Sequence, residues 1–130
     1  TKTALANTPP RVTGGGDYVI PARTLFGLTA AAADPDGDAL TYSWEQADPA
    51  TAYRNLNAPD PGQGPLFRPF LPVAGPARAF PAAASLAAAA TNLDGSVPLD
   101  GTAAAGNSYG YSRGERLPTT TRDLNFVAVV

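Results

Sequence analysis

The chain has 130 residues and a formal net charge of −2, and it contains no cysteine, histidine or methionine. This length suits a single domain. The missing histidine and cysteine exclude a Ser-His-Asp triad, a thiol nucleophile, disulfides and a zinc site built on imidazole or thiolate. The charge balance gives no basic footprint for nucleic acid, and no apolar run approaches the roughly 20 residues of a membrane-spanning helix.

Residues 1–10 form a polar lead that ends in two prolines, which is typical of a linker, so we place the domain at residues 11–130. Two short β-like runs open it: Tyr18-Val19-Ile20 after a glycine-rich turn, and residues 24–29, with apolar side chains two residues apart. Both runs predict short strands.

The clearest predicted strand covers residues 39–46. Leu40, Tyr42 and Trp44 alternate there with polar residues, which predicts one large apolar face. The run Asp34-Pro35-Asp36-Gly37-Asp38 precedes it as a dense turn signal.

Residues 47–116 hold many prolines and several alanine runs, with a short helix possible only over residues 85–92. We therefore expect a long Pro/Ala-rich loop insertion within the domain rather than a second domain. Residues 124–130 alternate apolar side chains and predict a final strand. The chain stops inside this run, so we expect a fold that lacks its last strand.

Residues 14–46 carry a Gly-x-Asp, two short strand-like runs and then Asp-Pro-Asp-Gly-Asp-x-Leu-x-Tyr-x-Trp. This pattern resembles the N-terminal half of a PKD-type immunoglobulin-like domain. The resemblance implies an all-β, Ig-like (PKD-like) β-sandwich, with Trp44 in its core.

Three later segments resemble a narrower group. Pro-Leu-Phe-Arg-Pro-Phe at residues 65–70, Arg-Ala-Phe-Pro at 78–81 and the run at 115–126 are similar to the Ig-like module attached to secreted bacterial reprolysin-like metallopeptidases. In that module a Trp-Glu-Gln strand, which matches residues 44–46 here, is followed by a Pro-Leu-Phe-Arg loop and a Leu-Pro-Thr-Thr turn. The resemblance implies an extracellular location. The catalytic zinc motif of that family lies in a separate domain, and nothing in this chain matches it.

The strongest cluster of candidate ligands is Asp34, Asp36 and Asp38, whose alternate spacing in a turn suits calcium, with Asp17 as an extra ligand from the glycine-rich turn. The alternative is that these residues simply form a good type I turn. An EF-hand loop is rejected because Ala39 stands where that loop needs glycine.

Aromatic and charged residues of the loops give further candidates. Tyr53, Tyr109 and Tyr111 form a candidate binding surface, although packing of the loops onto a thin core is the favoured interpretation. Arg68 and Arg78 are expected to bind carboxylates or backbone carbonyls. The isolated aspartates are expected to be solvated turn residues: Asp48, Asp60, Asp94, Asp100 and Asp123.

The sequence therefore predicts a non-catalytic, extracellular accessory module of a larger secreted bacterial protein. The expected parent is a metallopeptidase, and the module would act as spacer, stabiliser or binding domain. The alternative is a structural or assembly role through an open sheet edge, which invites strand addition. A small hydrolase built on carboxylates alone is the least favoured hypothesis, because no motif supports it.

Overall fold

The computed structural model describes residues 7–50, 60, 62–83, 115 and 117–130. Six short β-strands are the regular elements of this part, which confirms the all-β prediction: β1 (Arg11–Thr13), β2 (Phe26–Thr29), β3 (Ala31–Ala33), β4 (Ser43–Gln46), β5 (Ala77–Phe80) and β6 (Phe126–Val129). Within the same residues, no helix has the length and apolar character needed to cross a membrane.

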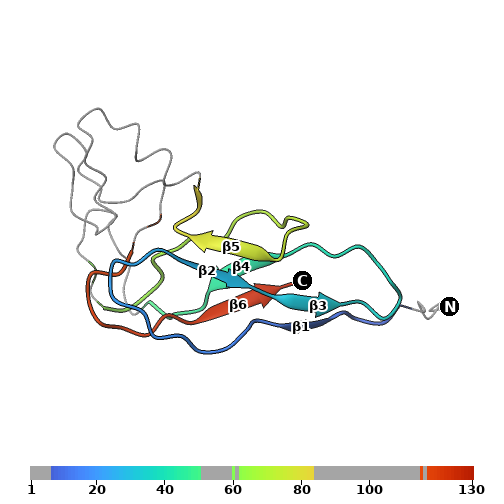
Figure 1. Cartoon of the computed structure of the whole chain (residues 1–130), viewed down its shortest axis with the longest axis horizontal. Coiled ribbons are helices and arrows are strands. Elements are labelled where there is room, and N and C mark those ends of the chain that lie inside the picture. Colours follow the sequence, from blue (N-terminus) through green and yellow to red (C-terminus); the bar gives the residue numbers. More distant parts are fainter. Residues whose placement is uncertain (1–6, 51–59, 61, 84–114, 116) are drawn as a thin grey trace.

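The strands pair antiparallel in three couples, β1 with β3, β2 with β5 and β4 with β6 (Figure 1). Phe26 of β2 faces Phe80 of β5, and Trp44 of β4 faces Ala128 of β6. Only the buried Ala30 separates β2 from β3. One continuous stretch of chain therefore pairs with β5 through β2 and with β1 through β3.

Each of the three runs with an alternating sequence pattern contains a strand, although each strand is shorter than the predicted run. In β4, Trp44 is buried while Glu45 is exposed. Phe26 and Leu28 of β2 are half-buried, as are Phe126 and Ala128 of β6, and these four side chains pack against the core. The period of two therefore identified the inward faces correctly.

Two parts of the N-terminal region differ from the prediction. Tyr18, Val19 and Ile20 form no strand, and all three are exposed, because no described segment pairs with them. Ala31–Ala33 forms β3 although three alanines carry no strand signal; pairing with β1 determines its conformation.

The region predicted as a loop insertion, residues 47–116, supplies both a strand and much of the core. Residues 77–80 form β5, and Leu66, Phe67 and Phe80 are among the buried hydrophobic residues. Pairing with β2 compensates for the weak strand signal of Ala-Arg-Ala-Phe. The short helix predicted over residues 85–92 lies outside the described residues.

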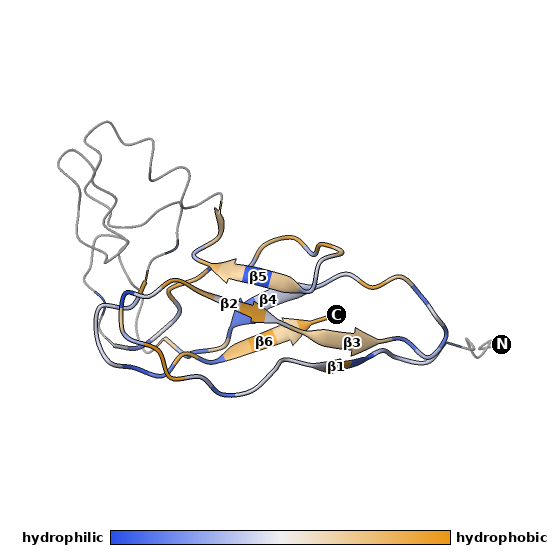
Figure 2. Cartoon of the chain, in the orientation of Figure 1, coloured by the Kyte–Doolittle hydropathy of each residue, from blue (hydrophilic) through white to orange (hydrophobic). Residues whose placement is uncertain are grey.

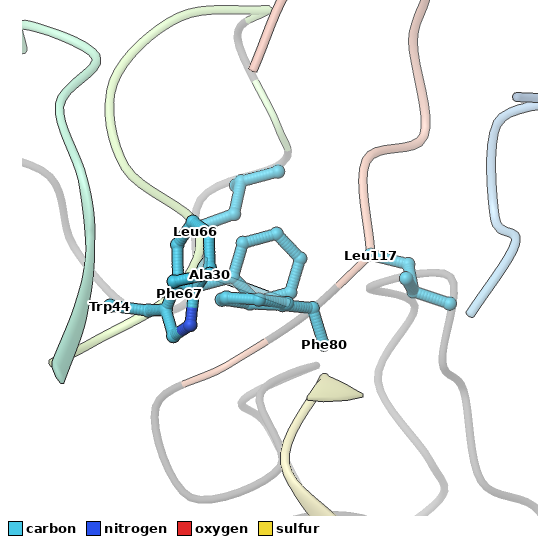
Figure 3. Packing of buried hydrophobic residues seen from close by; sticks show 6 residues of the cluster. All are labelled: Ala30, Trp44, Leu66, Phe67, Phe80 and Leu117. Carbon is cyan, nitrogen blue, oxygen red and sulfur yellow. The ribbon is translucent and has the colours of Figure 1, made fainter. Parts of the chain in front are cut away.

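The core gathers between the couples β2–β5 and β4–β6. The rings of Phe26, Phe67, Phe80 and Phe126 contact one another with centroid separations of 4.7–6.0 Å. Figure 3 shows the side chains of Leu66, Phe67 and Phe80 close to Ala30 and Trp44, with Leu117 at the side of the cluster. The phenylalanines thus join strands from both couples to the loop that precedes β5.

Candidate functional site

Gln46, the last residue of β4, fastens the loop before β5 to the core. Its Oε1 accepts hydrogen bonds from the backbone N–H groups of Leu66 at 2.7 Å and Phe67 at 3.0 Å. Its Nε2 donates to the carboxylate of Asp48. One amide side chain thereby positions the two buried hydrophobic residues of the loop.

Arg78 of β5 and Glu115 form a buried ion pair. The Glu115 side chain is fully buried, and one of its oxygens accepts from Nη2 of Arg78. The other oxygen accepts from the backbone N–H of Ala82 at 2.8 Å. Glu115 therefore joins the chain just before residue 84 to the chain just after residue 114.

The guanidinium of Arg78 is also held by carbonyls and rings. It donates to the carbonyl oxygens of Trp44 at 2.7 Å and Arg68 at 2.6 Å. It lies 4.6 Å from the ring centroid of Phe70 and 4.4 Å from that of Phe80, and Arg68 lies over the Phe70 ring at 4.7 Å. Burial lowers the pKa of Arg78, while the charge of Glu115 opposes that shift.

Asp60 and Arg122 form a second buried ion pair, with Oδ1 of Asp60 2.9 Å from Nη1 of Arg122. Asp60 also accepts from the N–H of Gly62 at 2.9 Å and of Thr119 at 3.3 Å, and Arg122 donates to the carbonyl of Gly64. Burial by itself raises the pKa of Asp60, but these N–H groups and the Arg122 charge outweigh it and hold the pKa below its ordinary value.

These contacts correct part of the prediction for the isolated aspartates. Asp60 is buried and paired, and Asp48 is half-buried and accepts hydrogen bonds from Gln46 and Asn125, so neither is a solvated turn residue. Asp123 is exposed as predicted. Asp94 and Asp100 lie outside the described residues. The sequence could not reveal the pairs, because each joins residues far apart in the chain.

The prediction for Arg78 is confirmed, because its guanidinium binds both a carboxylate and backbone carbonyl groups. Arg68 contacts a phenylalanine ring instead of a described carboxylate. Neither Glu115 nor Asp60 was identified from the sequence as a buried group. The one usable signal was that Glu115 begins the third segment of the metallopeptidase-module resemblance, whereas Asp60 lies outside all three segments.

Residues 34–38, the aspartate turn, are held together by their own hydrogen bonds. Oδ1 of Asp34 accepts from the N–H groups of Asp36 at 2.8 Å and Asp38 at 3.2 Å, and the N–H of Gly37 donates to the Asp34 carbonyl at 3.3 Å. Gly37 has a φ of 80°, which favours glycine. Asp36 in turn accepts from the N–H of Thr8, so the end of the predicted linker is attached to this turn.

Asp17 does not lie beside this turn. Arg11 pairs with Ala33, next to Asp34, and β1 then runs away from the turn toward Thr13, so Asp17 lies beyond the opposite end of the β1–β3 couple. Among the described residues, no three carboxylates gather in a way that could hold a metal ion. The turn explains Asp34 and Asp36 without calcium, and the calcium site stays a prediction.

The three tyrosines of the predicted binding surface, Tyr53, Tyr109 and Tyr111, lie outside the described residues. A different exposed apolar feature is present on β6. Val127 and Val129 are 48% and 45% exposed, and they lie on the outer face of the β4–β6 couple, opposite Glu45 and Ser43. Figure 2 shows β6 hydrophobic along its length, whereas β5 has a hydrophilic band.

No family model, no curated protein and no protein of solved structure matches the chain. The function of the chain is therefore inferred from the chemistry of its described residues. That chemistry is a buried polar framework around an aromatic core, together with an uncharged strand at a sheet edge.

Proposed function

We propose that the chain is a non-catalytic, extracellular Ig-like module of the PKD type, and that it serves a larger secreted bacterial protein, a metallopeptidase, as spacer, stabiliser or binding domain. In this proposal the couples β2–β5 and β4–β6 are the two layers of a β-sandwich. The phenylalanine cluster and Trp44 fill the space between them.

The observation that carries the proposal is the convergence of the segments whose sequence resembles the metallopeptidase module. Gln46 of Trp-Glu-Gln binds the backbone of Pro-Leu-Phe-Arg. Arg78 of Arg-Ala-Phe-Pro binds Glu115, with which the third segment begins. Segments that are separate in sequence thus meet through buried polar groups, as expected if they are the structural framework of one module type.

The test is the coding sequence around the chain together with the activity of the isolated chain. We expect a His-Glu-x-x-His motif in the same reading frame, because that motif supplies two zinc ligands and a general base. We also expect the isolated chain to hydrolyse neither casein nor gelatin nor a set of aryl glycosides.

The two measurements have distinct consequences. A reading frame without any enzyme domain would overturn the metallopeptidase assignment while leaving the module itself. Turnover by the isolated chain, abolished by Asp→Asn substitution at one of its carboxylates, would overturn the non-catalytic proposal altogether.

A second function, assembly through an open sheet edge, is favoured by one specific observation. Among the described strands β6 is paired by backbone hydrogen bonds with β4 alone, and its outer face exposes two valines. An exposed, apolar edge strand is a template for strand addition.

A further inference from the structure

Residues 69–76, the apolar loop, lead into β5 and expose large hydrophobic side chains. Residues 69–77 carry no polar or charged side chain, and Figure 2 shows a hydrophobic stretch in this loop. Leu71 is 87% exposed and Val73 is 58% exposed. Single exposed apolar residues are common on proteins, whereas an uninterrupted apolar surface indicates a site of interaction.

Hydrogen bonds to its backbone fix the apolar loop and leave these side chains outside. Val73 and Tyr42 exchange backbone hydrogen bonds at 2.7 and 3.0 Å. The carbonyl of Pro76 accepts from Nε1 of Trp44 at 3.0 Å and from the N–H of Ala30 at 3.2 Å. The exposed side chains are therefore held in place before any partner arrives, which lowers the conformational entropy lost on binding.

The composition of the apolar loop favours lipid over protein as that partner. Residues 69, 72 and 76 are prolines, which have no N–H group, and the carbonyl of Phe70 accepts from the Ser43 hydroxyl at 3.1 Å. Unpaired backbone groups are costly in the apolar part of a bilayer, so a loop with few of them suits insertion there. A protein interface depends on direct hydrogen bonds, and residues 69–77 supply no side-chain donor or acceptor.

Positive charge lies at the base of the apolar loop. Arg68 is exposed, and its guanidinium lies 4.7 Å from the ring centroid of Phe70, while that of Arg78 lies 4.6 Å from the same centroid. Glu115 neutralises Arg78, whereas no described carboxylate forms a salt bridge with Arg68. Residues 62–83 contain no aspartate or glutamate. An arginine beside exposed apolar side chains complements an anionic headgroup above acyl chains.

We propose that the apolar loop attaches the chain to the surface of an anionic lipid bilayer. Leu71 and Val73 enter the boundary between headgroups and acyl chains, and Arg68 binds the phosphate of a headgroup. The attachment is peripheral and reversible, because two apolar side chains and one charge bind far more weakly than a membrane-spanning helix. The proposal goes beyond the accessory-module function and does not depend on the parent protein being a metallopeptidase.

The first experiment is co-sedimentation of the full 130-residue chain with sucrose-loaded vesicles, at up to about 5 mM lipid because weak binding is expected. One set of vesicles is phosphatidylcholine alone, and the other contains about 40% phosphatidylglycerol to supply negative charge. We expect at least about threefold more bound chain on the anionic vesicles, and Arg68→Gln should remove that preference.

Two double variants test the apolar contribution. Leu71→Ser/Val73→Ser should lower binding to the anionic vesicles at least about fivefold, because the inserted apolar area is lost. The matched control is Val12→Ser/Val19→Ser, which replaces two exposed valines outside the apolar loop and should bind like the wild type.

A second measurement reads which surface meets the lipid, and it stays informative if a serine variant misfolds. The chain has no cysteine, so Leu71→Cys and Val19→Cys variants each carry one thiol for an environment-sensitive dye. On anionic vesicles the emission of the dye at residue 71 should shift to shorter wavelength, because the dye enters an apolar phase. The dye at residue 19 should show no such shift.

Each contrary result overturns the proposal. Absence of binding to both kinds of vesicle at the highest lipid concentration does so and leaves a protein as the partner of the apolar loop. Binding that Leu71→Ser/Val73→Ser does not change, or equal dye shifts at residues 71 and 19, shows that another surface meets the bilayer. Equal binding to neutral and anionic vesicles overturns the role of Arg68. These results are distinct from the reading-frame and hydrolysis tests of the accessory-module function.

Discussion

At the scale of single residues, the fold depends on two carboxylates buried beside arginines. Removing water from a charge is costly, and a buried pair stabilises a protein only while both partners and their further hydrogen bonds are present. Asp60 satisfies this condition through Gly62, Thr119 and Arg122. Loss of its charge would leave the guanidinium of Arg122 buried without a counter-ion.

We therefore predict that Asp60→Asn lowers the free energy of unfolding at pH 6 by about 3 kcal/mol, measured by urea denaturation. The pKa of Asp60 lies below its ordinary value of 3.8. Its charge therefore stabilises the fold fully above that pH, and the contribution is lost as the pH falls from 3.8 through the folded pKa. The difference between wild type and variant should shrink in the same range.

The matched control for Asp60 is Asp123→Asn, which neutralises an exposed aspartate of the same region and should change stability by less than about 0.5 kcal/mol. Adding Arg122→Gln to Asp60→Asn should recover part of the loss, because it removes the uncompensated charge. A variant Asp60→Asn as stable as the wild type at pH 6 would contradict the prediction.

At the scale of elements, the aspartate turn between β3 and β4 separates two interpretations. The calcium interpretation predicts that millimolar Ca²⁺ raises Tm through binding linkage, and that Asp36→Ala/Asp38→Ala abolishes the rise. The turn interpretation predicts that Asp34→Ala costs about 1 kcal/mol with or without Ca²⁺, because two N–H groups lose their acceptor. Thermal unfolding with calcium or with chelator measures both effects, and a Tm indifferent to Ca²⁺ removes the calcium site.

The elements that could be predicted from the sequence are those with a strong local pattern. Alternation located β2, β4 and β6 and their inward faces, since each places apolar side chains two residues apart. β3 and β5 could not be found in this way, because tertiary pairing compensates for their alanines. Tyr18–Ile20 shows the converse, since strand-forming residues remain without a described partner strand.

At the scale of the whole molecule, the described core and its polar framework join segments from both sides of residues 84–114. Among the described residues, Ala30, Trp44, Leu66, Phe67 and Phe80 of the core precede that range, and Leu117 follows it. Its two flanks are joined, because Glu115 accepts from the N–H of Ala82 and from Arg78. The buried pair of Arg78 and Glu115 joins residues that are far apart in the sequence, so no local pattern could predict it. For this reason the sequence of residues 47–116 predicted loops alone.

We predict that replacing residues 84–114 by a linker of about six Gly and Ser residues leaves the fold intact. Each halving of a closed loop lowers the entropic cost of closure by about 0.6 kcal/mol, so Tm should stay equal or rise. Calorimetry and the near-ultraviolet circular dichroism of Trp44 measure this.

The same replacement with Glu115→Gln should lower Tm, since the flanks lose their charged acceptor. A fall of more than about 8 °C in the first variant would show that the replaced residues stabilise the fold. The intact shortened chain lacks Tyr109 and Tyr111, so its binding properties compared with those of the full chain directly measure the predicted role of these tyrosines.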